Sequence, residues 1–159
     1  MEYRIGHGID SHRFETGRSL ILGGVEIPFD KGLLGHSDAD ALAHAAADAI
    51  LGALALGDLG QHFPDTDPAY KDANSLDILA QVVEMMQERN YRVVNLDCTI
   101  IAEAPRLGPY LAMMQKNLAG VLLASESAVS VKAKTAEKMG PIGAGEGIAA
   151  SVVVLLAGV

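Results

Sequence analysis

The sequence has few aromatic residues and a single cysteine, and each of these shortages excludes a kind of core or a kind of site. The 159 residues include no Trp and one Cys, Cys98, so neither an intrachain disulfide nor a four-thiolate metal site can form. Aromatic residues make up 4% of the chain and hydrophobic residues 50%, so small aliphatic side chains must fill the core. The length is typical of one domain, which we expect to span residues 1–159.

Positive charge is also scarce, with 12 Lys and Arg against 20 Asp and Glu and a net charge of −8. Because nucleic acids and anionic membranes attract basic surfaces, we expect neither as a partner. A phosphorylated small molecule stays compatible with this charge, since metal ions and a few local cations can hold phosphates. No apolar run is long enough to span a bilayer and the first residues do not resemble a signal peptide. We therefore expect a cytoplasmic protein, or a plastid stromal one if the source carries plastids.

Hydrophobic periodicity predicts an α/β (α+β) fold with a mixed sheet of four to five strands. The last predicted strand is informative about assembly. Residues 152–157 are apolar at every position, so both faces of this strand should be covered. Either another subunit or a second layer of the same chain could cover the outer face. The predicted strands are 3–12, 92–102, 129–135 and 148–157, with a hairpin or bulged strand at 20–27; the predicted helices are 38–56, one opening at 74–75, and one after Pro109.

Asp10 and His12 are two residues apart on the first predicted strand, so their side chains point to the same side and can share a metal ion. His44, on the helix 38–56, would complete a set of two imidazoles and a carboxylate. Such a set suits Zn²⁺ with one coordination position open, as in catalytic sites. Alternatively, the strand pair is merely solvated, and His44 is a core histidine hydrogen-bonded to Asp48.

The helix 38–56 is apolar on nearly all sides, yet Asp40, His44 and Asp48 form one polar stripe along it. No Lys or Arg on the helix neutralises the aspartates, and buried charges need a partner. We therefore expect the stripe to face a cleft, with Asp48 orienting the imidazole of His44.

Three further segments suit a phosphorylated substrate. His36 and Ser37 precede the helix, whose N-terminus would attract phosphate, although Ser37 could be only its cap. The acidic loop 57–67 suits polyol hydroxyls, or its aspartates only stabilise their own turns. The segment 132–138 combines Lys, Thr and Glu, which suit phosphate and a hard cation. The glycine-rich loop 140–147 has the spacing of no standard nucleotide fingerprint.

Together these segments resemble the 2-C-methyl-D-erythritol 2,4-cyclodiphosphate synthase family over essentially the whole chain. The resemblance implies a homotrimer of α/β subunits with sheets packed around the three-fold axis, helices on the other face, and active sites between subunits. It implies conversion of 4-diphosphocytidyl-2-C-methyl-D-erythritol 2-phosphate to the cyclic diphosphate and CMP. The matching motifs are 6–12, 36–40 with His44 and Asp48, 57–60, 63–67, 104–106 and 134–138.

The resemblance also implies roles for individual residues. Asp10, His12 and His44 would bind Zn²⁺ or another divalent ion, and Glu137 would help to hold Mg²⁺ or Mn²⁺ on the substrate diphosphate. His36 and Thr135 would stabilise the transition state. The implied substrate-binding residues are Asp10, His12, His36, Ser37, Asp58, Gly60, Phe63, Asp65, Ala102, Pro105, Arg106, Lys134, Thr135, Ala136, Glu137, Pro141 and Ala144.

The chain departs from the family pattern at three of these positions. Pro141 and Ala144 stand where many members carry an aromatic residue and an arginine, and Lys134 stands where threonine is common. Two other functions fit the same residues: a metal-dependent phosphohydrolase that uses water as nucleophile, and a trimeric ligand-binding regulator without turnover.

Overall fold

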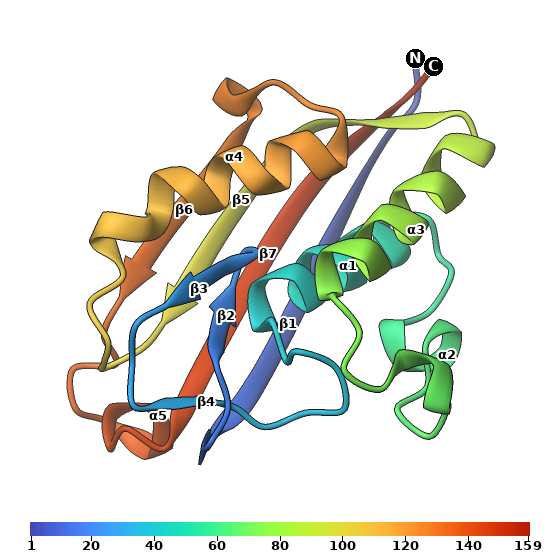
Figure 1. The fold of residues 1–159 in the computed structure, drawn as a ribbon. Coiled ribbons are helices and arrows are strands. Elements are labelled where there is room, and N and C mark those ends of the chain that lie inside the picture. Colours follow the sequence, from blue (N-terminus) through green and yellow to red (C-terminus); the bar gives the residue numbers. More distant parts are fainter.

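A mixed five-stranded sheet forms the framework of this computed structural model, which describes all residues 1–159 (Figure 1). The strand order is β4-β1-β7-β5-β6, and only the β5–β6 pair is parallel. The predicted α+β class and sheet size are thus confirmed. The strands are β1 (Tyr3–Thr16), β4 (Lys31–Leu33), β5 (Tyr91–Ile101), β6 (Val129–Lys134) and β7 (Gly147–Gly158).

The helices cover one face of this sheet, and the predicted hairpin of β2 (Leu20–Leu22) and β3 (Val25–Ile27) lies over the same face (Figure 1). None of the helices combines the length and apolar composition needed to span a bilayer. The glycine-rich loop predicted at 140–147 contains a short helix, α5 (Gly140–Gly143). The other helices are α1 (Ala41–Ala53), α2 (Leu59–His62), α3 (Ser75–Glu88) and α4 (Leu111–Leu122), with short 3-10 turns η1 (Pro68–Tyr70), η2 (Gly108–Tyr110) and η3 (Glu126–Ala128).

Helix α1 packs against β1 more closely than side chains on the strand would allow. A Cβ atom placed on Gly6 would lie 1.8 Å from the carbonyl oxygen of Ala49, and one on Gly8 would lie 2.0 Å from that of Ala45. Ala45 and Ala49, whose carbonyl groups face the two glycines, are completely buried. The helix that carries His44 is therefore held directly on the strand that carries Asp10 and His12.

Helix α1 begins later than predicted, because Asp40 rather than Ser37 is its N-cap. The Asp40 carboxylate is fully buried and accepts hydrogen bonds from the backbone N–H groups of Ala43, Gly23 and Gly24. Burial raises the pKa of Asp40 despite these hydrogen bonds. Asp40 therefore does not face the cleft, contrary to prediction, and its carboxylate caps the helix N-terminus.

A β-bulge in β5 changes which side chains reach the core. The pairing of β5 with β7 shifts between Val93 and Asn95, so Val93 is buried, although strict alternation back from Leu96 would bury Val94. Beyond the bulge the strand alternates regularly, with Leu96, Cys98 and Ile100 completely buried. The core therefore occupies the helix side of the sheet.

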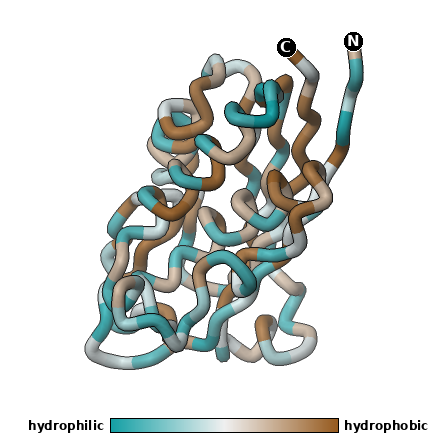
Figure 2. Tube along the Cα trace, turned by 90° about the vertical axis from the view of Figure 1, so that its right-hand side faces the viewer, coloured by the Kyte–Doolittle hydropathy of each residue, from teal (hydrophilic) through white to brown (hydrophobic).

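The opposite face of β1 and β7 is apolar and open to solvent. Ile5 is 75% exposed, Ile9 63% and Val153 49%, and the two strands pair along their whole length. Figure 2 shows the hydrophobic C-terminal strand running beside the N-terminal one, with the helical layer to one side. The alternative of a sheet covered on both sides by its own chain is thus wrong.

Replacing Gly8 by Ala tests the close contact between α1 and β1. The new methyl group would collide with backbone rather than with a flexible side chain, so we expect a loss of at least about 3 kcal/mol in the free energy of unfolding. Urea denaturation at fixed protein concentration measures this loss.

Gly120→Ala is the matched control, because Gly120 lies in α4 with open space around it. There we expect no loss and a gain of up to about 1 kcal/mol from helix propensity. An unchanged unfolding midpoint in Gly8→Ala would contradict the proposed packing.

Candidate metal centre and substrate pocket

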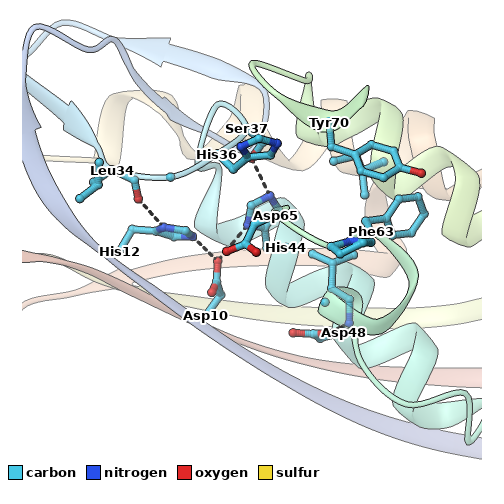
Figure 3. Close-up of a pocket in the computed structure, with 15 residues that line it drawn as sticks. Asp10, His12, Leu34, His36, Ser37, His44, Asp48, Phe63, Asp65 and Tyr70 are labelled. Carbon is cyan, nitrogen blue, oxygen red and sulfur yellow. Dashed lines mark hydrogen bonds and ion pairs between the residues drawn. The ribbon is translucent and has the colours of Figure 1, made fainter. Parts of the chain in front are cut away.

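One atom from each of Asp10, His12 and His44 meets in a group whose members all lie within 4.8 Å of one another. Strand β1 supplies Asp10 and His12, and α1 supplies His44 (Figure 3). Asp10 Oδ2 lies 2.7 Å from His12 Nε2 and 3.1 Å from His44 Nδ1. The structure thus brings together the three predicted ligands, which are distant in sequence.

The remaining nitrogen of each imidazole has its own partner. His12 Nδ1 lies 2.7 Å from the carbonyl oxygen of Leu34, which can only accept, so Nδ1 carries the proton and Nε2 points to Asp10. His44 Nε2 lies 2.8 Å from Ser75 Oγ and 3.2 Å from Ser37 Oγ. Hydrogen-bonded outer nitrogens are usual for metal-binding histidines, so these residues fit a divalent ion.

The charges of the group also fit a cation. Burial opposes ionisation of Asp10, but the adjacent imidazoles of His12 and His44 outweigh it and lower the pKa of Asp10. Burial likewise opposes a charged His12, but the neighbouring Asp10 carboxylate outweighs it and raises the pKa of His12. A carboxylate that stays ionised among imidazoles attracts protons or, in their place, a metal ion.

Asp48 does not orient His44, contrary to prediction. Its Oδ1 accepts a hydrogen bond of 2.6 Å from the backbone N–H of Leu59. His44 bonds instead to Asp10 and Ser37 (Figure 3), and also to Ser75. The alternative of a core histidine bonded to Asp48 is wrong for the same reason. Asp48 fixes the start of α2, and burial raises the pKa of its carboxyl group.

The three candidate ligands lie in the wall of a cavity of about 540 Å³. Phe63 and Tyr70 pack edge to face in the same wall, with ring centroids 5.3 Å apart. Asp58 is not in the wall: it is exposed, and its side chain accepts from the backbone N–H of Gln61 at the start of α2. The lining residues are Asp10, His12, Leu34, Gly35, His36, Ser37, His44, Asp48, Leu59, Gly60, Phe63, Pro64, Asp65, Tyr70 and Ile78.

The other predicted substrate-binding residues belong to a second cluster, which does not line this cavity. The cluster lies where β5 and β6 end and around α5, on the opposite side of Figure 1 from α2. Glu103 holds part of it together, because Glu103 Oε1 accepts from the backbone N–H groups of Ala136 at 2.9 Å and Lys138 at 3.1 Å. Its predicted members are Ala102, Pro105, Arg106, Lys134, Thr135, Ala136, Glu137, Pro141 and Ala144.

Sequence reasoning did not single out Leu34, Tyr70, Ser75 or Glu103. Leu34 acts through its backbone carbonyl, which carries no sequence signal. Ser75 was read only as a helix-opening residue, and nothing in the sequence links it to His44, 31 positions away.

Two imidazoles and a carboxylate in the wall of a polar cavity define a metal-dependent enzyme site on an α+β fold. The chain belongs to the YgbB family, whose match covers residues 3–157. A relative from Geobacillus thermodenitrificans (strain NG80-2), named 2-C-methyl-D-erythritol 2,4-cyclodiphosphate synthase, is 58% identical over 154 residues, or 97% of this chain and 96% of the relative. The family resemblance predicted from the motifs is confirmed.

Solved structures agree with this membership. The bifunctional IspDF from Campylobacter jejuni matches with a TM-score of 0.95 and 42% identity over 99% of this chain, which spans 43% of that longer chain. A 2C-methyl-D-erythritol-2,4-cyclodiphosphate synthase described as a CDP-bound form matches with a TM-score of 0.89 and 36% identity. That match covers 97% of this chain and 100% of the other.

We expect His44→Ala to abolish stoichiometric zinc binding while the protein stays folded. The substitution removes one of three ligands, and only an aspartate and a histidine would remain. Elemental analysis after dialysis measures the zinc content, and circular dichroism checks the fold. His62→Ala is the matched control, because the His62 ring bonds to the carbonyl of Leu56, outside the group. Equal zinc content in His44→Ala and the unmodified protein would refute the assignment.

Proposed function

We propose that this chain converts 4-diphosphocytidyl-2-C-methyl-D-erythritol 2-phosphate to 2-C-methyl-D-erythritol 2,4-cyclodiphosphate and CMP, in the non-mevalonate route to isoprenoid precursors. The main support is the group Asp10, His12 and His44 in the cavity wall, in a chain similar over its full length to synthases of this name. In this reaction the 2-phosphate attacks the β-phosphate within the same molecule, and CMP leaves.

Such a reaction needs charge neutralisation and positioning more than a strong base, because the nucleophile is already an anion. Zn²⁺ or another divalent ion at Asp10, His12 and His44 would offset the repulsion between the phosphates. His36 and Ser37 lie beside that site and would hold phosphate oxygens. Holding two reacting groups together can contribute about 7–11 kcal/mol in favourable cases.

The same cavity has room for the methylerythritol part of the substrate. Phe63 and Tyr70 would pack against its carbon skeleton, and Asp65 would accept hydrogen bonds from its hydroxyl groups. Gly60 leaves space in the wall. The role of Asp58 in this pocket stays a prediction, since its side chain caps α2.

The cytidine part and the second metal ion belong, in this proposal, to the second cluster. Thr135 and Glu137 are exposed there, and Glu137 would help to hold Mg²⁺ or Mn²⁺ on the diphosphate. A relative described as a CDP-bound form supports a cytidine nucleotide as ligand. Lys134, Pro141 and Ala144 lie in or beside this cluster, so the departures from the family pattern would alter its contacts rather than the metal centre.

We further propose that the active site is completed between neighbouring subunits of a cytoplasmic homotrimer. The second cluster does not line the cavity of its own chain, and the open face of β1 and β7 is apolar. Exposed Ile5, Ile9 and Val153 would be buried when such faces pack together. Each cavity would then receive the second cluster of an adjacent copy.

Incubation with the cytidine-linked substrate, zinc and magnesium tests the reaction itself. We expect CMP and cyclic diphosphate in equal amounts, measured by chromatography and ³¹P NMR. Release of inorganic phosphate instead would favour the phosphohydrolase, and binding of cytidine nucleotide without CMP release would favour the regulator. His44→Ala should reduce CMP release by at least about 100-fold, corresponding to about 2.7 kcal/mol in the barrier.

Mixing two inactive variants tests the shared site. His44→Ala damages the cavity and Thr135→Ala damages the second cluster, so each alone should be inactive. Co-expressed with different tags and isolated as mixed trimers, they should recover up to about a third of the unmodified activity, because each mixed trimer pairs an intact cavity with an intact second cluster at one of its three sites. Mixed oligomers that stay inactive, although each variant alone assembles normally, would place the whole site within one chain and contradict this part of the proposal.

A further inference from the structure

We propose that Ser75 and Asp38 are positioning residues that fix the tautomer and orientation of His44, so that its Nδ1 presents a lone pair to the metal. This inference rests on the metal centre proposed above. It gives these two residues the task that the sequence had suggested for Asp48.

Ser75 is placed for this task by the start of α3. It is 1% exposed, lies outside the cavity wall, and its Oγ is 2.8 Å from His44 Nε2. Asp38 holds Ser75 through both carboxylate oxygens: Oδ2 accepts from the backbone N–H of Ser75 at 3.1 Å, and Oδ1 accepts from its hydroxyl group. Ser75 is therefore fixed by a carboxylate before it meets the imidazole.

The single hydroxyl proton of Ser75 decides the direction of the chain of hydrogen bonds. This proton points to Asp38, because the Ser75 hydroxyl group donates to Asp38 Oδ1. The Oγ atom can then only accept from His44, so the proton of the neutral imidazole must sit on Nε2. Nδ1, which faces Asp10, is left with the lone pair that a metal requires.

Ser37 does not replace Ser75 in this role. Its Oγ is farther from His44 Nε2, at 3.2 Å, and already accepts from the backbone N–H of Ala39 at 3.1 Å. No carboxylate accepts the Ser37 hydroxyl proton, so that hydroxyl group does not impose a direction. Its Oγ also lies 3.3 Å from Ser75 Oγ, to which the Ser37 hydroxyl group can donate.

Asp38 also connects this chain of hydrogen bonds to the rigid part of the fold. Its Oδ1 accepts from the backbone N–H of Asp40 at 3.1 Å, where the buried cap of α1 begins. The start of α1 and the start of α3 are thereby tied to one carboxylate. An imidazole held in this way loses less orientational entropy when it binds an ion. Removing such hydrogen-bond partners of metal ligands typically lowers metal affinity 10–100-fold.

Zinc affinity of the assembled protein, measured by competition with a chromophoric chelator, tests this chain. We expect Ser75→Ala to weaken zinc binding about 10–100-fold, and Asp38→Asn to weaken it as well, because an amide cannot hold Ser75 through two acceptors. Ser75→Thr keeps the hydroxyl group and should restore affinity. Ser19→Ala and Asp77→Asn, both at exposed positions, are the matched controls and should bind zinc normally.

A second measurement needs no variant. In the zinc-loaded protein, ¹H–¹⁵N NMR should show the His44 ring proton on Nε2, exchanging slowly with water and close to the β-protons of Ser75. Rapid exchange of that proton would overturn the inference even if a Ser75 variant did not fold.

The two proposals fail in different ways. If Ser75→Ala binds zinc as the unmodified protein does, while His44→Ala does not bind it, the metal centre stands and the positioning role is wrong. If the unmodified protein binds no zinc, the metal centre itself is wrong, and the positioning role falls with it.

Discussion

The close approach of α1 to β1 is the contact on which the site depends. Two glycines on the strand leave room for the helix backbone, and the helix carries alanines where it faces them. The two elements therefore meet with almost no side chain between them. Asp10 and His12 follow these glycines on the same face of the strand. His44 lies in the part of the helix that passes over them. The close packing of the two backbones therefore brings the three candidate ligands together.

Packing alone does not orient the two imidazole rings. Their orientation is fixed by hydrogen bonds to residues outside the set of candidate ligands. The carbonyl of Leu34 orients one imidazole, and Ser75, held by Asp38, orients the other. Asp40 holds the start of α1 against the β2–β3 turn. The carbonyl of Leu34 can only accept, and the Ser75 hydroxyl group, which donates to Asp38, can then only accept from His44.

The strongly acidic chain must handle a substrate that carries three phosphate groups in the proposed reaction. The fold gathers imidazoles and hydroxyl groups in the cavity, while the carboxylate of Asp48 in its wall is engaged at the start of α2. The open face of β1 and β7, with its exposed apolar side chains, would serve assembly. Its burial between copies would provide the free energy of assembly, and assembly would bring the second cluster to the cavity.

The sequence by itself determined the fold class, most strands and helices, the alternation that sets Asp10 and His12 on one side, and the family, because these follow from local periodicity and from motifs in order. It did not determine the start of α1, since Ser37 and Asp40 are equally good caps and only tertiary burial selects Asp40. Nor could it show that Asp48 turns to Leu59 while Ser75 turns to His44, because hydrogen-bond partners far apart in sequence are chosen by the packing of α1 against α3. Periodicity reports which face a residue occupies, whereas the partner that it meets there depends on three-dimensional distances that only the folded chain sets.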